Sequence, residues 1–144
     1  MVIIVGNNAE KSRFKAEKLF GQIFPEQEFV IAQNRAVINA PSAAVIVEKN
    51  ASAEIKAALG IIADEDGSFD EFPRGVQLIT CGVNQKNTVS FTSRSNDKIT
   101  LSLNRAIHAK NGIAEPLELP AKLLDELSEF DYMAAFAASL LLRY

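Results

Sequence analysis

The fold class of this chain is decided by the stretch Val2-Ile3-Ile4-Val5-Gly6-Asn7-Asn8-Ala9. Residues 2–5 form a short apolar run rich in β-branched side chains, which is typical of a buried strand. Gly6 and Asn7 end the run, and the side-chain oxygen of Asn8 can accept a hydrogen bond from a free N–H at a helix start. A buried strand, a turn and a capped helix in this order indicate an α/β fold.

Further strands and helices are predicted along the next fifty residues. Apolar side chains recur at helical spacing until Pro25 ends the helix; they are Ala16, Leu19, Phe20 and Ile23. The apolar runs at residues 29–32 and 43–47 predict two more strands. Ser52 is expected to cap a helix over residues 52–59, which Gly60 ends.

The second half of the chain predicts an antiparallel extension. Residues 63–75 are acidic and turn-rich and predict a surface loop, and residues 76–80 predict another buried strand. Residues 88–92 and 99–103 alternate apolar with polar side chains around a Ser-Asn-Asp turn, which predicts a hairpin. If the two strands pair in register, their Ser and Thr side chains share one face, and this face is either solvent-exposed or a docking surface.

The chain closes with a predicted edge strand and an apolar helix. Residues 116–120 are bracketed by prolines, which favours an edge strand or a loop. Ser128 and Asp131 have the spacing of a capping box for a helix through Leu142. That helix is apolar on nearly every side, so we expect it to be buried in the core or against another subunit. Residues 1–144 are therefore predicted to form one α/β domain: a mostly parallel sheet with flanking helices, an antiparallel hairpin and a buried C-terminal helix.

Composition and charge exclude several classes of protein. The chain has 144 residues, of which 48% are hydrophobic and 23% charged, and its net charge is −3. We expect no nucleic-acid partner, because such proteins usually present clustered basic side chains. We also expect no membrane partner, since no apolar stretch is long enough to cross a bilayer. The single Cys81 allows no intrachain disulfide, and with no signal peptide in the sequence this favours the cytoplasm.

Catalytic motifs are absent from the sequence. Gly6 alone does not make the three-glycine dinucleotide fingerprint, and no phosphate-binding loop of the GxxxxGK[S/T] type occurs. One cysteine and one histidine, Cys81 and His108, cannot form the common zinc sites, and the sequence does not bring them together as a nucleophile and base. We therefore assign no catalytic residue, no metal and no cofactor.

Several segments resemble part of the central domain of Mur ligases, the ATP-dependent cell-wall peptide synthetases. These segments are Val45-Ile46-Val47-Glu48-Lys49-Asn50, Leu78-Ile79-Thr80-Cys81-Gly82-Val83, the residues 88–103, and Phe130-Asp131-Tyr132-Met133-Ala134-Ala135. In that family, a strand ending in Asn-Asp-Asp precedes a helix, and a Gly-x-His-Asn segment opens a late Ala-rich helix. This chain lacks the ATP loop and both polar motifs, so the resemblance implies a truncated, non-catalytic relative. It marks Lys49, Asn50, Thr80 and Cys81 as the place of the family's nucleotide-side crevice.

The predicted ligand site lies where the parallel strands end. Ligands of open α/β sheets bind beyond the carboxyl ends of the strands, where the strand order reverses. The candidate residues are Gly6, Asn7, Asn8, Lys49, Asn50, Thr80 and Cys81.

The leading interpretation of function is a non-enzymatic binding or scaffold domain of a bacterial-type cytoplasm. Its partner would be another protein or a second copy bound through the apolar C-terminal helix. The alternative is a nucleotide- or sugar-nucleotide-binding protein or enzyme. In that case the strand-end crevice takes a small anionic ligand, and Lys49 neutralises its phosphate.

Overall fold

A computed structural model describes residues 1–67 and 72–144. Its helices are α1 (Ala9–Lys18) and α2 (Glu129–Arg143), and the short π-helical turn η1 (Leu19–Ile23) follows α1. Its strands are β1 (Val2–Gly6), β2 (Phe29–Gln33), β3 (Val37–Val47), β4 (Glu54–Asp64), β5 (Leu78–Cys81), β6 (Val89–Arg94), β7 (Lys98–Leu103), β8 (Ile107–Ala109), β9 (Gly112–Ala114) and β10 (Leu117–Lys122).

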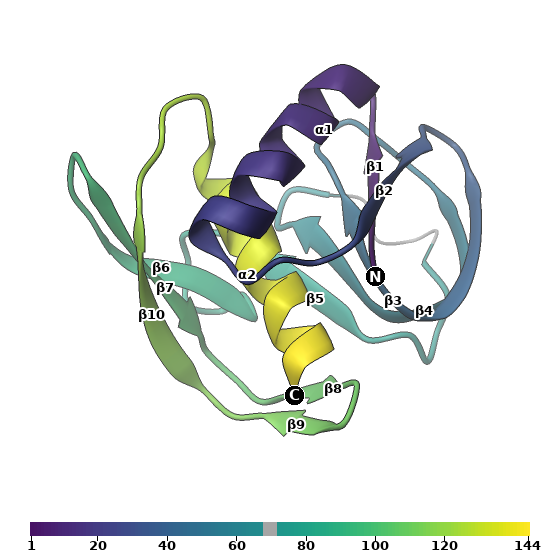
Figure 1. Ribbon diagram of the computed structural model, residues 1–144. Coiled ribbons are helices and arrows are strands. Elements are labelled where there is room, and N and C mark those ends of the chain that lie inside the picture. Colours follow the sequence, from purple (N-terminus) through teal and green to yellow (C-terminus); the bar gives the residue numbers. More distant parts are fainter. Residues whose placement is uncertain (68–71) are drawn as a thin grey trace.

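One eight-stranded sheet forms the centre of the fold (Figure 1). Its strand order is β10-β7-β6-β5-β4-β3-β1-β2. All pairs from β2 to β6 are parallel, whereas β7 is antiparallel to both β6 and β10. A separate antiparallel pair, β8 and β9, lies beside the carboxyl end of α2. The predicted fold class is therefore confirmed, including the hairpin, the edge strand and the C-terminal helix.

Both faces of the central strands are buried, which explains their continuous apolar runs. Val2, Ile4 and Ile46 face the cluster that contains α1 and α2. Val5 and Val47 alternate with them and face a second cluster. This second cluster also contains the first halves of β3 and β4, which arch away from the rest of the sheet (Figure 1). The strands bend where their register shifts, between Ala40 and Ala44.

The two helices begin where the sequence predicts, because their caps are local. The Asn8 side chain accepts a hydrogen bond from Lys11 N at 3.1 Å. Ser128 and Asp131 form the predicted capping box at the start of α2. Residues 131–141 of α2 are all buried within this chain. The sequence predicts that this helix is buried either in the core or against another subunit. Its burial in the core explains why its side chains are apolar on nearly every side.

The helix predicted over residues 52–59 is wrong, because these residues begin strand β4. Alanine and leucine favour helices, but intrinsic propensity is weak beside tertiary contacts. Here Ile55 is buried in the second cluster, and Ile38 and Ile55 are paired across β3 and β4. The parallel strands β3 and β4 are thus joined by residues 48–53 without a helix. The predicted loop at residues 63–75 begins too early, because β4 continues through Asp64. Residues 68–71 of that loop lie outside the described residues.

The row of Ser and Thr side chains on the β6–β7 hairpin is buried at the end of the hairpin away from its turn. The expectation of a solvent-exposed face is therefore wrong for this end. Ser90 and Ser102 lie opposite each other and are buried. The Asn104 amide donates to Ser90 Oγ at 2.9 Å, and Ser102 Oγ donates to Asn104 Oδ1 at 2.8 Å. A register shift between Phe91 and Ser93 then breaks the expected alternation.

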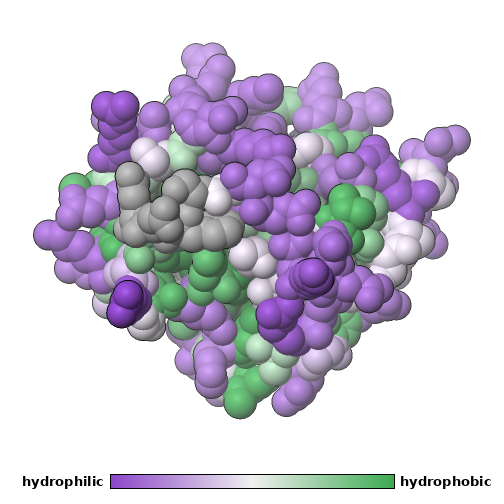
Figure 2. All heavy atoms as spheres, turned by 180° about the vertical axis from the view of Figure 1, so that it is seen from behind, coloured by the Kyte–Doolittle hydropathy of each residue, from purple (hydrophilic) through white to green (hydrophobic). Residues whose placement is uncertain are grey.

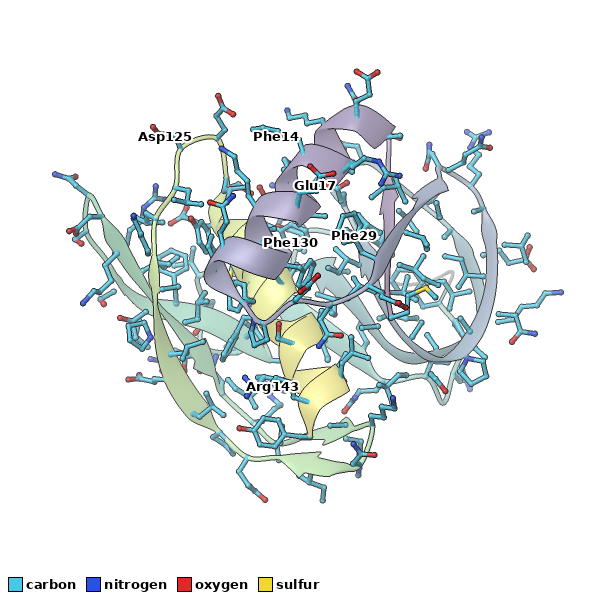
Figure 3. The ribbon with its side chains drawn as sticks, viewed as in Figure 1. Phe14, Glu17, Phe29, Asp125, Phe130 and Arg143 are labelled. Carbon is cyan, nitrogen blue, oxygen red and sulfur yellow. The ribbon has the colours of Figure 1, made fainter. Side chains whose placement is uncertain are left out.

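The surface of the molecule is predominantly polar. Seen from behind, apolar side chains gather in the middle and lower part of the face (Figure 2). Figure 3 labels Phe14 on α1, Phe29 in β2 and Phe130 in α2. Phe14 is exposed, whereas Phe29 and Phe130 are partly buried and pack against the cluster that contains α1 and α2. Among the described helices, none is long and apolar enough to cross a membrane.

Candidate functional site

The carboxyl ends of four neighbouring parallel strands form one edge of the sheet. Val5 pairs with Val47, Val47 with Ala63, and Asp64 with Cys81, so β1, β3, β4 and β5 end together. We call this edge, with the residues that follow each strand, the strand-end rim. The polar residues of the rim are Asn7, Asn8, Glu48, Lys49, Asn50, Asp64, Glu65 and Asp66.

Four of the seven predicted site residues are exposed on this rim. They are Asn7, Asn8, Lys49 and Asn50. The Asn7 amide donates to the backbone oxygen of Asn50 at 2.7 Å, which ties the segment after β1 to the segment after β3. The structure therefore brings together the predicted residues from these two strands.

The other three predicted residues lie below the surface of the rim or are covered. Gly6 and Cys81 are buried, and Thr80 is half-buried, with its hydroxyl oxygen accepting a hydrogen bond from Thr88 N at 3.2 Å. Burial, and to a smaller extent the Asp64 carboxylate, raise the pKa of the Cys81 thiol. A buried, protonated thiol is a poor nucleophile.

Three hollows lie along the rim, and Lys49 lines all of them. The central hollow, of about 410 Å³, lies between the ends of β3 and β4; its lining includes Asn50, Asp64, Asp66 and Phe72. The α1-side hollow, of about 200 Å³, is lined by Asn7, Asn8, Lys11, Ser12, Lys15, Glu48 and Lys49. The α2-side hollow, of about 300 Å³, includes Asp64, Glu65, Val83, Phe91, Glu129 and Phe130.

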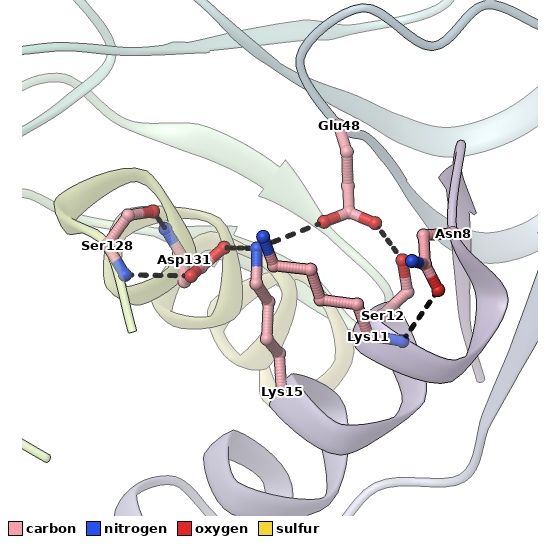
Figure 4. Close-up of polar contacts among 7 residues, drawn as sticks. All are labelled: Asn8, Lys11, Ser12, Lys15, Glu48, Ser128 and Asp131. Carbon is pink, nitrogen blue, oxygen red and sulfur yellow. Dashed lines mark hydrogen bonds and ion pairs between the residues drawn. The ribbon is translucent and has the colours of Figure 1, made fainter. Parts of the chain in front are cut away.

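A chain of polar contacts connects β3, α1 and α2 beneath the α1-side hollow (Figure 4). Lys15 Nζ lies 3.7 Å from Glu48 Oε2 and 3.4 Å from Asp131 Oδ1. The Ser12 hydroxyl donates to Glu48 Oε1. Asp131 Oδ2 in turn accepts from Ser128 N at 2.8 Å in the capping box of α2. One lysine thus neutralises two carboxylates that come from different elements.

Two glycines of the rim are closely covered by carboxylates from neighbouring strands. A side-chain carbon at Gly6 would overlap Glu48 Oε1 and Ser12 Oγ. A side-chain carbon at Gly82 would overlap the Glu65 carboxylate and the Asn87 amide, which hydrogen-bond to each other at 2.6 Å. Glycine is therefore needed at both strand ends to admit a neighbouring acidic side chain.

Sequence reasoning missed Glu48, Asp64 and Asp66 as site residues. Glu48 directly follows a predicted buried strand, and the same signal selected Lys49 and Asn50. The sequence does not mark Asp64 as a strand-end residue, because residues 52–59 are predicted to form a helix rather than the first part of β4. Correct prediction of β4 would have placed Asp64 at a strand end.

The rim does not bring Cys81 and His108 together as a nucleophile and a base. His108 and Cys81 belong to opposite ends of β5, since the Gln77 side chain, just before this strand, bonds to the His108 backbone at both N and O. Within residues 1–67 and 72–144, no three His, Cys, Asp or Glu side chains are grouped to hold a metal ion. The groups that a ligand could reach are Lys49, the amide of Asn50, and the carboxylates of Asp64 and Asp66.

Comparisons of this chain with protein-family models, with curated proteins and with solved structures find no match.

Proposed function

We propose that the protein is a non-catalytic binding domain that holds a small polar ligand in the central hollow. The observation that carries the proposal is the convergence of Lys49, Asn50, Asp64 and Asp66 on a space of about 410 Å³ at the carboxyl ends of β3 and β4. Small-molecule sites usually measure about 300–1,000 Å³, and in open α/β sheets they lie at this edge.

The charges around the central hollow favour a ligand with an amino group or several hydroxyls. Lys49 brings one positive charge, whereas Glu48, Asp64 and Asp66 bring three negative charges. Glu48 is paired with Lys15, and in the described part of the chain Lys49, Asp64 and Asp66 form no ion pair. A ligand with one positive and one negative group, such as an amino acid, complements this lining. Hydroxyl groups of a sugar also suit it, because they donate to carboxylates and accept from an ammonium.

A sugar nucleotide is the second candidate, and one observation favours it. Lys49 lines both the central and the α1-side hollow, and the latter adds Lys11 and Lys15. A sugar in the central hollow could therefore carry its phosphates toward the three lysines. The Glu48 carboxylate, which also lines the α1-side hollow, would have to move aside.

A thermal-shift panel of amino acids, sugars, amino sugars, nucleotides and sugar nucleotides tests the proposal. Ligand at 100 times its Kd adds about 2.7 kcal/mol of stability, which gives a clear rise in Tm. We expect Lys49→Ala and Asp64→Asn to abolish the rise. Lys122→Ala removes an exposed lysine of the edge strand β10, which does not line any of the three hollows, and should leave the rise unchanged. No rise for any compound, or a rise unaffected at Lys49 and Asp64, contradicts the proposal.

Partner, location and ancestry also belong to this proposal. Self-association remains a prediction. Because residues 131–141 of α2 are buried, we propose that it would use an edge strand of the sheet, β2 or β10, rather than this helix. A monomeric mass by light scattering at micromolar protein contradicts it.

We propose a bacterial-type cytoplasmic location, which the single free Cys81 supports. A distant relation to Mur ligases is a proposal supported by the order of β3, β5, the β6–β7 hairpin and α2 along the chain.

A further inference from the structure

The end of β1 contains a space shaped for a negatively charged group. Gly6 lacks the side chain that would fill this space, and the Glu48 carboxylate lies there instead. The position is where the strand order reverses, since β1 leads through α1 to β2 on one side and has β3 on the other. In open α/β sheets this reversal point is the usual place for a ligand.

Two groups that contact the Glu48 carboxylate favour an anion, although Lys15 Nζ is shared with Asp131 Oδ1 at 3.4 Å. The Ser12 hydroxyl, on a residue only 4% exposed, donates to Oε1, and Lys15 Nζ lies 3.7 Å from Oε2. Both groups belong to α1, a ten-residue helix whose amino end starts at the same turn. A helix amino end and a lysine both stabilise negative charge.

Room for an external anion exists directly beside the carboxylate. The α1-side hollow measures about 200 Å³, and Lys11, Lys15 and Lys49 all line it. Glu48 is the only carboxylate in its described lining. Withdrawal of that one side chain would leave a hollow with three lysines and a serine hydroxyl.

We propose that the β1–α1 turn is an anion-binding cradle that the protein's own Glu48 carboxylate occupies, and that it binds phosphate when this carboxylate is removed. Glu48 thus acts as an internal competitor for a phosphate group at the switch point of the sheet. A phosphorylated ligand would have to displace this carboxylate from Ser12 and Lys15. This site shares Glu48 and Lys49 with the central hollow. Ser12 and Lys15 do not line the central hollow, however, and Asp64 does not line the α1-side hollow. Variants of Lys15 and Asp64 therefore test the two proposals separately.

The carboxylate that covers Gly82 provides a matched control. Glu65 fills the space over Gly82 as Glu48 fills the space over Gly6. Its hydrogen-bond partner is the neutral Asn87 amide rather than a serine hydroxyl beside a lysine. Removal of Glu65 should open a similar space but should not create an anion site.

Titration of the Glu48→Ala protein with inorganic phosphate at constant ionic strength, followed by calorimetry, tests the cradle. We expect saturable binding to one site that is at least tenfold tighter than in the wild type. Glu48→Gln, which still fills the space, should not gain it, and neither should Glu65→Ala. Lys15→Met added to Glu48→Ala should weaken phosphate binding at least tenfold.

Three results would overturn the proposal. They are no gain in Glu48→Ala, an equal gain in Glu65→Ala, or a gain that survives Lys15→Met. If Glu48→Ala does not fold, as judged by its circular dichroism, Glu48→Ser takes its place, because it also removes the carboxylate and leaves a small polar side chain at this half-buried position. Asp64→Asn, which alters the central and α2-side hollows but not the α1-side hollow, should bind phosphate as the wild type does. This separates the cradle from the proposed ligand site.

Discussion

At the scale of single residues, Gly6 and Glu48 are expected to depend on each other. The methyl group of Gly6→Ala would displace the Glu48 carboxylate from Ser12. Hydrogen bonds to charged groups contribute about 1.5–3 kcal/mol, so we expect a loss of that size in the free energy of unfolding. Urea denaturation measures it.

A double-mutant cycle separates this coupling from a backbone effect. In a Glu48→Ala background, the nearest atom left beside the methyl group is Ser12 Oγ, a hydroxyl that can rotate away once its carboxylate partner is gone. Gly6→Ala should then cost less than about 1 kcal/mol. Gly112→Ala is the outside control, since nothing lies within 4 Å of a side-chain carbon there. An equal cost of Gly6→Ala in both backgrounds would show that Glu48 does not fill the space.

Lys15 is the residue whose loss should disturb the rim most. Its removal in Lys15→Met leaves the Glu48 and Asp131 carboxylates without their shared cation, and Asp131 is only 6% exposed. Breaking a buried ion pair costs about 3–5 kcal/mol, and the partial exposure of Lys15 reduces our expectation to about 2–3 kcal/mol. Glu48→Gln should restore part of the stability in Lys15→Met while destabilising the wild type. Additive effects in this cycle would contradict the shared-cation arrangement.

At the scale of elements, the capping box of α2 should be measurable on its own. Ser128 accepts a hydrogen bond from Asp131 N at 3.2 Å. Loss of a serine cap costs about 0.5–2 kcal/mol, so we expect Ser128→Ala to lower the free energy of unfolding by about 1 kcal/mol. Ser42→Ala, at an exposed position of β3, should change it by less than about 0.5 kcal/mol. Equal effects of the two variants would show that the cap does not stabilise α2.

The elements that the sequence predicts correctly are those with local signals. α1 and α2 begin at Asn8 and Ser128 because each cap depends on residues three positions away. The hairpin is also local, since β6 and β7 are joined by a short turn. β4 has no such signal: residues 54–60 become a strand only because β3 pairs with them. A helix-like composition in that segment is overridden by burial of Ile55 and Ile61.

At the scale of the whole molecule, the topology decides the site. The sequence predicts that Gly6, Lys49 and Cys81 end on one edge, and the parallel register places their strands there. The sequence could not predict that Glu48 lies over Gly6 or that Glu65 lies over Gly82. Each contact joins residues at the ends of two different strands, which are far apart in the sequence. The rim is therefore closed over β1 and β5 and open between β3 and β4. That difference supports the proposal of a ligand in the central hollow and of a phosphate cradle that Glu48 occupies.

The burial of Cys81 should appear in the stability of the whole protein at high pH. Burial raises the pKa of its thiol in the folded state, so this thiol stays protonated when the thiol of the unfolded chain ionises. The unfolded state then binds one proton fewer than the folded state, and the free energy of unfolding falls as the pH rises through the ordinary thiol pKa of about 8.5.

The difference between the wild type and Cys81→Ala isolates this contribution, because all other groups titrate in both proteins. Below about pH 8 the difference in free energy of unfolding should be constant. Above the ordinary thiol pKa it should shift against the wild type by up to about 1.4 kcal/mol per pH unit. Urea denaturation from about pH 7 to about pH 10 measures it. A difference that stays constant across this range would mean that Cys81 ionises equally in both states, and therefore that the end of β5 is open to water.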